Sequence, residues 1–377
     1  MEVENLLQII GADFYTGVPD SQLSALCNYL MIRYGIDGKH HIIGANEGNC
    51  VAIAAGYNLA TDKIPVIYLQ NSGLGNIVNP VASLTNNNVY AIPQIFIIGW
   101  RGEPGIQDEP QHIYQGKITL KLLEDLDIKH FVISDKTSVN EVRSAMELFK
   151  KYLNKGKSVA FVIKKGALTY ENKISYKNKN KLLREDVIEH ILKAANNDII
   201  IATTGKTGRE VYEIRQRNAQ SHKYDFLTVG SMGHCSSIAL GVAINKPTKK
   251  IWCIDGDGAL LMHMGALAVI GKYEPENLVH IVLNNGAHES VGGLPTVADN
   301  LDIAEIAKFC GYKNSICVDN ICDLDRELIN AKNKKELSLI EIKCAIGART
   351  DLGRPKEKPI ENKKIFMENL KKGVKYD

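Results

Sequence analysis

Short runs of apolar residues alternate with longer amphipathic stretches along almost the whole chain. In the first half, runs rich in valine, isoleucine and phenylalanine predict buried strands at 41–45, 65–70, 93–100, 129–134 and 158–166. Stretches with a helical period, such as 48–60 and 140–153, lie between them. Continuous apolar strands separated by helices are typical of parallel sheets covered on both faces, so an α/β fold is predicted.

A polar segment rich in lysine and asparagine, residues 170–181, interrupts this alternation, which then resumes with strands expected at 198–204, 225–229, 250–256, 278–285, 315–319 and 337–345. A chain of 377 residues is also too long for one ordinary core. We therefore predict two α/β domains, 1–169 and 183–377, joined by a linker at 170–182. The second includes a charged tail from Arg349 onward, which we expect to lie on the surface.

Composition narrows the possible partners. A formal net charge of +3 gives no reason to expect nucleic acid, and no apolar run approaches the roughly 20 residues that span a bilayer. The N-terminus lacks the pattern of a signal peptide, and the eight cysteines form no C-x-x-C pair. We expect buried reduced thiols and a cytoplasmic location.

The strongest chemical signal follows two strands of the second half. Gly256-Asp257-Gly258-Ala259 comes directly after one strand, and Asn284-Asn285-Gly286 follows the next. Adjacent parallel strands would bring both turns to one edge of a sheet. The carboxylate of Asp257, the amide oxygen of Asn285 and the backbone carbonyl of Ala287 form an oxygen-only set that suits Mg²⁺. Either turn alone would be an ordinary turn, but the two together favour a metal–diphosphate site.

These motifs resemble the thiamine diphosphate fingerprint of the 2-oxo acid decarboxylases. The resemblance implies two domains of the thiamine diphosphate-binding fold, 1–169 for the pyrimidine and 183–377 for the diphosphate. It implies Asp257, Asn285 and Ala287 as ligands of Mg²⁺. It implies cofactor contacts at Glu47, Gly205, Lys206, Thr207, Gly230, Ser231, Met232, Gly256, Asp257, Gly258, Ala259 and Asn285. Taken alone, Met232 could be a core side chain and Thr204–Gly208 a helix cap.

Glu47 has a chemical role that thiamine chemistry requires. The cofactor uses its own 4′-amino group as a base, provided that a carboxyl group in a dry site holds a proton at N1′ of the pyrimidine. Glu47 follows a predicted strand and begins an alanine-rich helix, which suits the close approach of a ring. A glutamate at a helix N-terminus is common for other reasons, and the family resemblance decides for the activating role. In this family the two halves of the site come from different subunits, which implies a homo-oligomer with active sites at the subunit interface.

Further motifs, among them Gly17–Ser21, Asn71–Asn76, Trp100–Gly105, Asp108–His112 and Asn284–Thr296, extend the resemblance along nearly the whole chain to the phosphonopyruvate decarboxylase family. That family is implied to convert 3-phosphonopyruvate to phosphonoacetaldehyde and carbon dioxide in phosphonate biosynthesis, toward 2-aminoethylphosphonate. Asp20 and His112 are the candidates for proton transfer, although Asp20 could cap a helix and His112 could be an ordinary loop residue. Candidates for binding the phosphonate are Arg101, Lys206, Arg349 and Arg354, because a phosphonate needs cationic or N–H donors. His288 and Glu289, just beyond the predicted metal-binding turn, are further candidates for facing the substrate.

Two alternatives stay open. The acid could be sulfopyruvate or another small 2-oxo acid, since sulfopyruvate decarboxylase has a similar architecture. The chain could instead be a non-catalytic thiamine diphosphate-binding subunit, which the presence of Glu47 argues against. A dinucleotide-binding protein is disfavoured, because no G-x-G-x-x-G motif follows an early strand.

Overall fold

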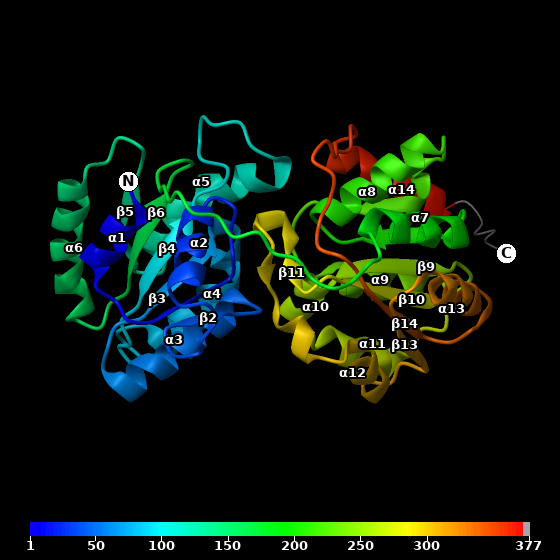
Figure 1. Ribbon diagram of the computed structural model, residues 1–377, viewed down its shortest axis with the longest axis horizontal. Coiled ribbons are helices and arrows are strands. Elements are labelled where there is room, and N and C mark those ends of the chain that lie inside the picture. The colour runs from blue at the N-terminus through cyan, green and yellow to red at the C-terminus, as the bar shows by residue number, and fades with distance from the viewer. Residues whose placement is uncertain (372–377) are drawn as a thin grey trace. The chain divides into compact units, whose positions relative to one another are not determined.

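The computed structural model describes residues 1–371, and the chain divides into two compact units, Met1–Ser175 and Tyr176–Asp377. Each unit contains its own six-stranded parallel sheet flanked by helices (Figure 1). The α/β class and the parallel sheets predicted from the apolar runs are thus confirmed. The division falls inside the segment 170–182, whose role as a linker stays a prediction.

The first unit has the strand order β2-β1-β3-β4-β6-β5, and every neighbouring pair is parallel. Its strands are β1 (Tyr15–Gly17), β2 (His41–Ile43), β3 (Val66–Gln70), β4 (Ile95–Gly99), β5 (Lys129–Ile133) and β6 (Val159–Ile163). Its α-helices are α1 (Val3–Ile10), α2 (Ser24–Arg33), α3 (Glu47–Thr61), α4 (Leu74–Pro80), α5 (Pro110–Asp125) and α6 (Val139–Leu153).

The second unit has the order β13-β14-β10-β9-β7-β8, again with parallel neighbours, and a separate antiparallel pair, β11–β12. Its strands are β7 (Ile199–Ala202), β8 (Asp225–Leu227), β9 (Ile251–Gly256), β10 (Leu278–Asn284), β11 (Ala287–His288), β12 (Leu294–Pro295), β13 (Asn314–Val318) and β14 (Ser338–Lys343). Its α-helices are α7 (Arg184–Ala195), α8 (Lys206–Arg217), α9 (Cys235–Asn245), α10 (Asp257–Met262), α11 (Ala266–Tyr273), α12 (Ile303–Phe309), α13 (Ile321–Asn333) and α14 (Pro359–Lys371).

The two sheets have the same topology. If the six long strands of each unit are counted along the chain, both orders are 2-1-3-4-6-5. In each unit the connection reverses direction between the first and third strands, β1 and β3 or β7 and β9. A reversal of this kind opens a crevice at the carboxyl ends of the strands, where ligands of α/β proteins bind. The topology therefore marks one edge of each sheet for function.

Alternation along the strands gives the second sheet a hydrophobic core on each face. Trp252 and Ile254 of β9 pack with α7, α8 and α13, whereas Ile251 and Cys253 of the same strand pack with α9, α11 and α12. Because both faces are covered, the central strands consist mainly of continuous apolar runs instead of alternating apolar and polar residues. This explains why continuous apolar runs predicted them.

All eight cysteines are free, as the absence of paired motifs predicted. Five are buried, Cys310 is half-buried, and Cys317 and Cys322 are exposed. The expectation of burial thus holds for five of them.

The charged tail contains a helix that its composition did not predict. Helix α14 carries one buried residue, Phe366, whose ring lies 5.5 Å from that of Phe226. Asn362 ties the same helix to β8, since its side chain donates to the carbonyl of Asp225 and accepts from the N–H of Leu227. Through Phe366 the tail therefore contributes to the core of the second unit.

Phe366→Ala is expected to lower the free energy of unfolding of the second unit by about 3 kcal/mol, because it removes a buried aromatic ring and leaves a cavity. Met367→Ala is the matched control: Met367 is the next residue of α14 and is 44% exposed. We expect its effect to stay within about 0.5 kcal/mol. Chemical denaturation of both variants measures the difference, and equal effects would contradict the docking of α14.

Candidate active site

The carboxyl ends of β9 and β10 lie side by side and carry the predicted metal ligands. Gly256 of β9 is paired in register with Leu283 of β10, so the residues that follow each strand meet at one edge. Asp257 is the first residue of α10, and Asn285 follows β10 directly. Both side chains are buried and offer oxygen atoms, which is the donor chemistry that Mg²⁺ requires.

The carboxyl group of Asp257 is held in place but is not neutralised. Its Oδ2 accepts a hydrogen bond of 2.6 Å from the hydroxyl of Thr296. Burial raises the pKa of Asp257 to about 6, although the Thr296 hydroxyl and the N–H of Gly258 lower it. No lysine, arginine or histidine forms an ion pair with it among residues 1–371. A bound divalent cation would supply the missing positive charge, so the residues present fit the ion.

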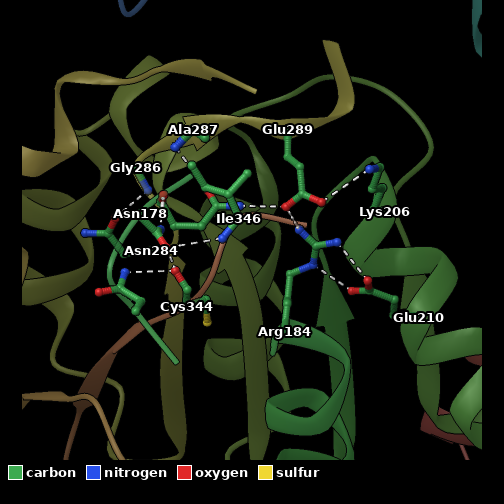
Figure 2. A network of polar contacts seen from close by, with 12 residues as sticks. Asn178, Arg184, Lys206, Glu210, Asn284, Gly286, Ala287, Glu289, Cys344 and Ile346 are labelled. Atoms are coloured by element: carbon green, nitrogen blue, oxygen red, sulfur yellow. Dashed lines mark hydrogen bonds and ion pairs between the residues drawn. The ribbon is translucent and has the colours of Figure 1, made fainter. Parts of the chain in front are cut away.

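The loop after β10 is fixed by hydrogen bonds on several sides. Gly286 adopts a left-handed φ of 67°, which turns the chain so that the N–H of Ala287 donates to Oδ1 of Asn285 at 3.1 Å. Asn178 donates from its amide nitrogen to the carbonyls of Asn285 and Cys344, both at 2.9 Å. Figure 2 shows Asn178 and Cys344 beneath this loop. The predicted ligands therefore lie on a turn whose conformation is held by hydrogen bonds.

The segment after β8 places Met232 beside the diphosphate motif. A Cβ atom added to Gly258 would lie 3.3 Å from Cε of Met232 and 3.3 Å from the ring of His288. The chain reaches this position through Ser231, whose φ of 53° is unusual for a residue with a side chain. Burial lowers the pKa of His288 to about 4, so the ring is neutral at physiological pH. Gly258 of the diphosphate motif thus lies directly against Met232 and His288.

The loop after β7 has the form expected of an anion-binding turn. Gly205 has a φ of 92° and precedes Lys206, the first residue of α8. This helix has 12 residues, and Thr207 is buried at its start. The free N–H groups and the dipole at such an N-terminus favour a phosphate. A diphosphate contact here stays a prediction.

In the first unit, Glu47 begins α3 after Asn46, whose side chain accepts from the N–H of Gly48. Glu47 is 5% exposed, and its Oε2 accepts a hydrogen bond of 2.7 Å from Asn76. Burial raises the pKa of Glu47, while the Asn76 hydrogen bond lowers it. A side chain added at Gly73 would overlap the Glu47 carboxyl group. Glu47 is therefore a dry, oriented carboxyl group, as pyrimidine activation requires.

Asp20 is fully buried at the carboxyl edge of the same sheet. Its Oδ1 accepts from the side chain of Gln70 at 2.6 Å, and its Oδ2 has no hydrogen-bond partner in the described part of the chain. Burial raises the pKa of Asp20, and the Gln70 hydrogen bond and the charge of Arg101 lower it. Leu23 occupies the N-cap position of α2, so Asp20 lies three residues before that position.

Arg101 acts on both Asp20 and His112 through its charge. Asp108 holds the guanidinium of Arg101 with hydrogen bonds of 2.8 and 2.5 Å, and Asn71 fixes the Arg101 backbone through both its N–H and its carbonyl. His112 belongs to the first turn of α5 and not to a loop, because Pro110 begins the helix. Burial and the charge of Arg101 lower the pKa of His112. The positive charge of Arg101 therefore lowers the pKa of both candidates for proton transfer, Asp20 and His112.

The substrate candidates of the tail differ in their surroundings. Arg349 forms ion pairs with Glu185, Glu213 and Asp351, so its charge is already matched. Arg354 lies between β14 and α14. Substrate contacts by either residue stay predictions.

The sequence is similar to those of known thiamine pyrophosphate enzymes. Residues 3–129 match the thiamine pyrophosphate enzyme N-terminal TPP binding domain, and residues 203–342 match the C-terminal TPP binding domain. A phosphonopyruvate decarboxylase of Streptomyces viridochromogenes is 32% identical over 95% of this chain and 91% of its own. That of Streptomyces hygroscopicus is 30% identical over 95% and 90%. A sulfopyruvate decarboxylase of Methanosarcina acetivorans is 29% identical over 86% of each chain.

This chain is a thiamine pyrophosphate enzyme of the phosphonopyruvate decarboxylase family. Membership confirms the thiamine diphosphate cofactor and the decarboxylase class predicted from the motifs. Among residues 1–371, no helix is both long enough and apolar enough to cross a bilayer.

Sequence reasoning missed the side chains that hold the predicted site residues in place. Thr296 lies 39 positions from Asp257, and Asn76 lies 29 positions from Glu47. Both occur inside motifs that carried the family resemblance, but no local spacing connects them to their partners. Only the strand order brings them together.

Gly73→Ala is expected to lower the turnover rate about 100-fold, because the added methyl group would displace the Glu47 carboxyl group by roughly an ångström. Gly75→Ala is the matched control, since a methyl group at Gly75 meets nothing within 4 Å. Steady-state kinetics with the cofactor at saturation separate the two variants. Similar rates for both would show that the position of Glu47 does not depend on Gly73.

Proposed function

We propose that this chain decarboxylates 3-phosphonopyruvate to phosphonoacetaldehyde and carbon dioxide in phosphonate biosynthesis, with thiamine diphosphate and Mg²⁺. The structural observation that carries the proposal is Glu47, a residue that is 5% exposed and whose carboxyl group is oriented by Asn76. A non-catalytic subunit would not need such a group. The choice of substrate rests on the two phosphonopyruvate decarboxylases, which are similar over 95% of the chain.

Each predicted residue has a role that its surroundings support. Thiamine diphosphate, when bound, supplies the electron sink that decarboxylation of a 2-oxo acid requires. Asp257, Asn285 and the carbonyl of Ala287 would hold Mg²⁺, and the backbone N–H groups at Gly205–Thr207 and Gly258–Ala259 would face the diphosphate. Glu47 would hold a proton at N1′ of the pyrimidine.

Asp20 and His112 would transfer the proton that takes the place of the carboxylate group lost from the substrate. Because burial raises the pKa of Asp20, this residue keeps its proton more readily and can donate it. Arg101, beside it, would attract the substrate's negative charge. His288, Lys206, Arg349 and Arg354 are retained as weaker candidates for substrate contact.

The substrate assignment predicts the order of the kcat/KM values for three acids. With Mg²⁺ and thiamine diphosphate supplied, we expect 3-phosphonopyruvate to give the highest kcat/KM, followed by sulfopyruvate and then pyruvate. The reason is that a dianionic phosphonate can use more cationic contacts than a sulfonate or a methyl group. Analysis of the aldehyde and carbon dioxide products measures the order. A preference for sulfopyruvate would support the alternative member of the family.

We also propose a homodimer in which Glu47 of one chain faces Asp257 of its partner. Neither Glu47→Gln nor Asp257→Asn should be active alone, since each site then lacks one anchor. A hybrid dimer of the two variants would contain one site with both anchors intact and one with neither. Mixing the variants after reversible dissociation should therefore restore activity. At most about half of the active sites in the hybrid dimers should be active. Absence of recovery in verified hybrids would place both anchors of a site in one chain.

A further inference from the structure

Four charged side chains of the second unit form a buried cluster beside the metal-binding turn. Arg184 begins α7, Lys206 and Glu210 belong to α8, and Glu289 begins the short helix η4 (Glu289–Val291). The side chains of Arg184, Glu210 and Glu289 are only 6, 2 and 8% exposed. Figure 2 shows Arg184 between the two glutamates, with Lys206 on the other side of Glu289.

Glu289 is the member of this cluster that contacts a predicted metal ligand. Its Oε2 accepts two hydrogen bonds, 2.7 Å from the amide nitrogen of Asn285 and 2.5 Å from Nη1 of Arg184. Its Oε1 lies 3.2 Å from Nζ of Lys206. One oxygen thus serves both Asn285 and Arg184, and the other serves a lysine that is 32% exposed.

The contact with Glu289 determines which end of the Asn285 amide can face a cation. An amide has a donor nitrogen and an acceptor oxygen of similar shape, and a half turn about the last bond exchanges them. A carboxylate accepts but cannot donate, so the nitrogen must face Glu289. The oxygen, which accepts from the Ala287 N–H, is then the end available for a metal.

Glu289 is itself held by a second pair. Glu210 binds Arg184 through both carboxylate oxygens, each at 2.7 Å. This pair fixes the orientation of the guanidinium that contacts Glu289. The contacts therefore run from Glu210 through Arg184 and Glu289 to Asn285. This chain of contacts joins two helices to the metal-binding turn.

We infer that Glu289 is a positioning residue, which holds the Asn285 amide with its oxygen toward the magnesium ion. The inference rests on the proposed metal site, but not on which acid is the substrate. If the carboxylate is removed, the buried guanidinium of Arg184 faces the amide of Asn285 and attracts its oxygen. The ligand is then drawn away from the ion, and groups of this kind typically change metal affinity about 10- to 100-fold.

The experiment titrates Mg²⁺ into the metal-free full chain in the presence of thiamine diphosphate and follows binding by calorimetry. Glu289→Ala should weaken the binding of Mg²⁺ about 10- to 100-fold. Glu210→Ala is the matched control, because it also leaves Arg184 with one glutamate but does not touch Asn285. We expect Glu210→Ala to lower thermal stability about as much as Glu289→Ala while weakening Mg²⁺ binding far less, because Glu289 keeps its contacts with Asn285, Arg184 and Lys206.

Two conservative variants separate positioning from simple charge. Glu289→Gln keeps an oxygen where Arg184 and Asn285 meet and turns its nitrogen toward Lys206, which can move into solvent. It should bind Mg²⁺ nearly as well as the unaltered chain. Glu289→Asp keeps the charge but withdraws the oxygen by one methylene, so it should weaken binding about tenfold or more. These variants also test the inference if Glu289→Ala does not fold.

The opposite order, with tight binding by Glu289→Asp and weak binding by Glu289→Gln, would overturn the inference in favour of an electrostatic effect. Equal weakening by Glu289→Ala and Glu210→Ala would overturn it in favour of general destabilisation. Asp257→Asn should abolish Mg²⁺ binding, and if it does not, the metal site and this inference fall together. Since no 2-oxo acid is present, failure to turn over phosphonopyruvate would leave the binding results intact.

Discussion

A carboxylate out of reach of water must be matched by a positive charge or keep its proton, and this constraint organises both sheet edges. Asp257 has no ion-pair partner among residues 1–371, and its pKa of about 6 reflects burial without a counter-charge. Within residues 1–371 the Glu47 carboxyl group forms no ion pair and accepts a hydrogen bond from the neutral amide of Asn76. One group is thus prepared for a cation, and the other for a proton on a ring nitrogen.

The protein around these groups mainly restricts their orientation. Thr296 holds one oxygen of Asp257, Asn76 holds one oxygen of Glu47, and Glu289 holds the nitrogen of Asn285. In each case the hydrogen bond from a neighbouring side chain fixes how the functional group is turned, and so which of its atoms faces the ligand. Side chains oriented in this way need little reorganisation when the cofactor binds, which is how a scaffold contributes to catalysis.

Apolar runs and turn motifs predicted the two sheets, the helix that begins at Glu47 and the meeting of Asp257 with Asn285, because these depend on local pattern and on the rules of parallel sheets. Helix α14 was not predicted because it buries only Phe366, so its charged composition hides the contact. The partners of Glu289 could not be predicted either. Arg184 lies 105 positions away, and only the folded chain brings the two together.

The two sheets share one strand order, and all six long strands of each come from one side of Ser175. No hydrogen-bonded strand pair therefore depends on the peptide bond that joins the units. A gene that encoded the halves as separate polypeptides would leave every strand pair of both sheets with its neighbour. Fusion in this chain instead fixes their ratio at one to one, so that each C-terminal TPP binding domain is synthesised together with an N-terminal one.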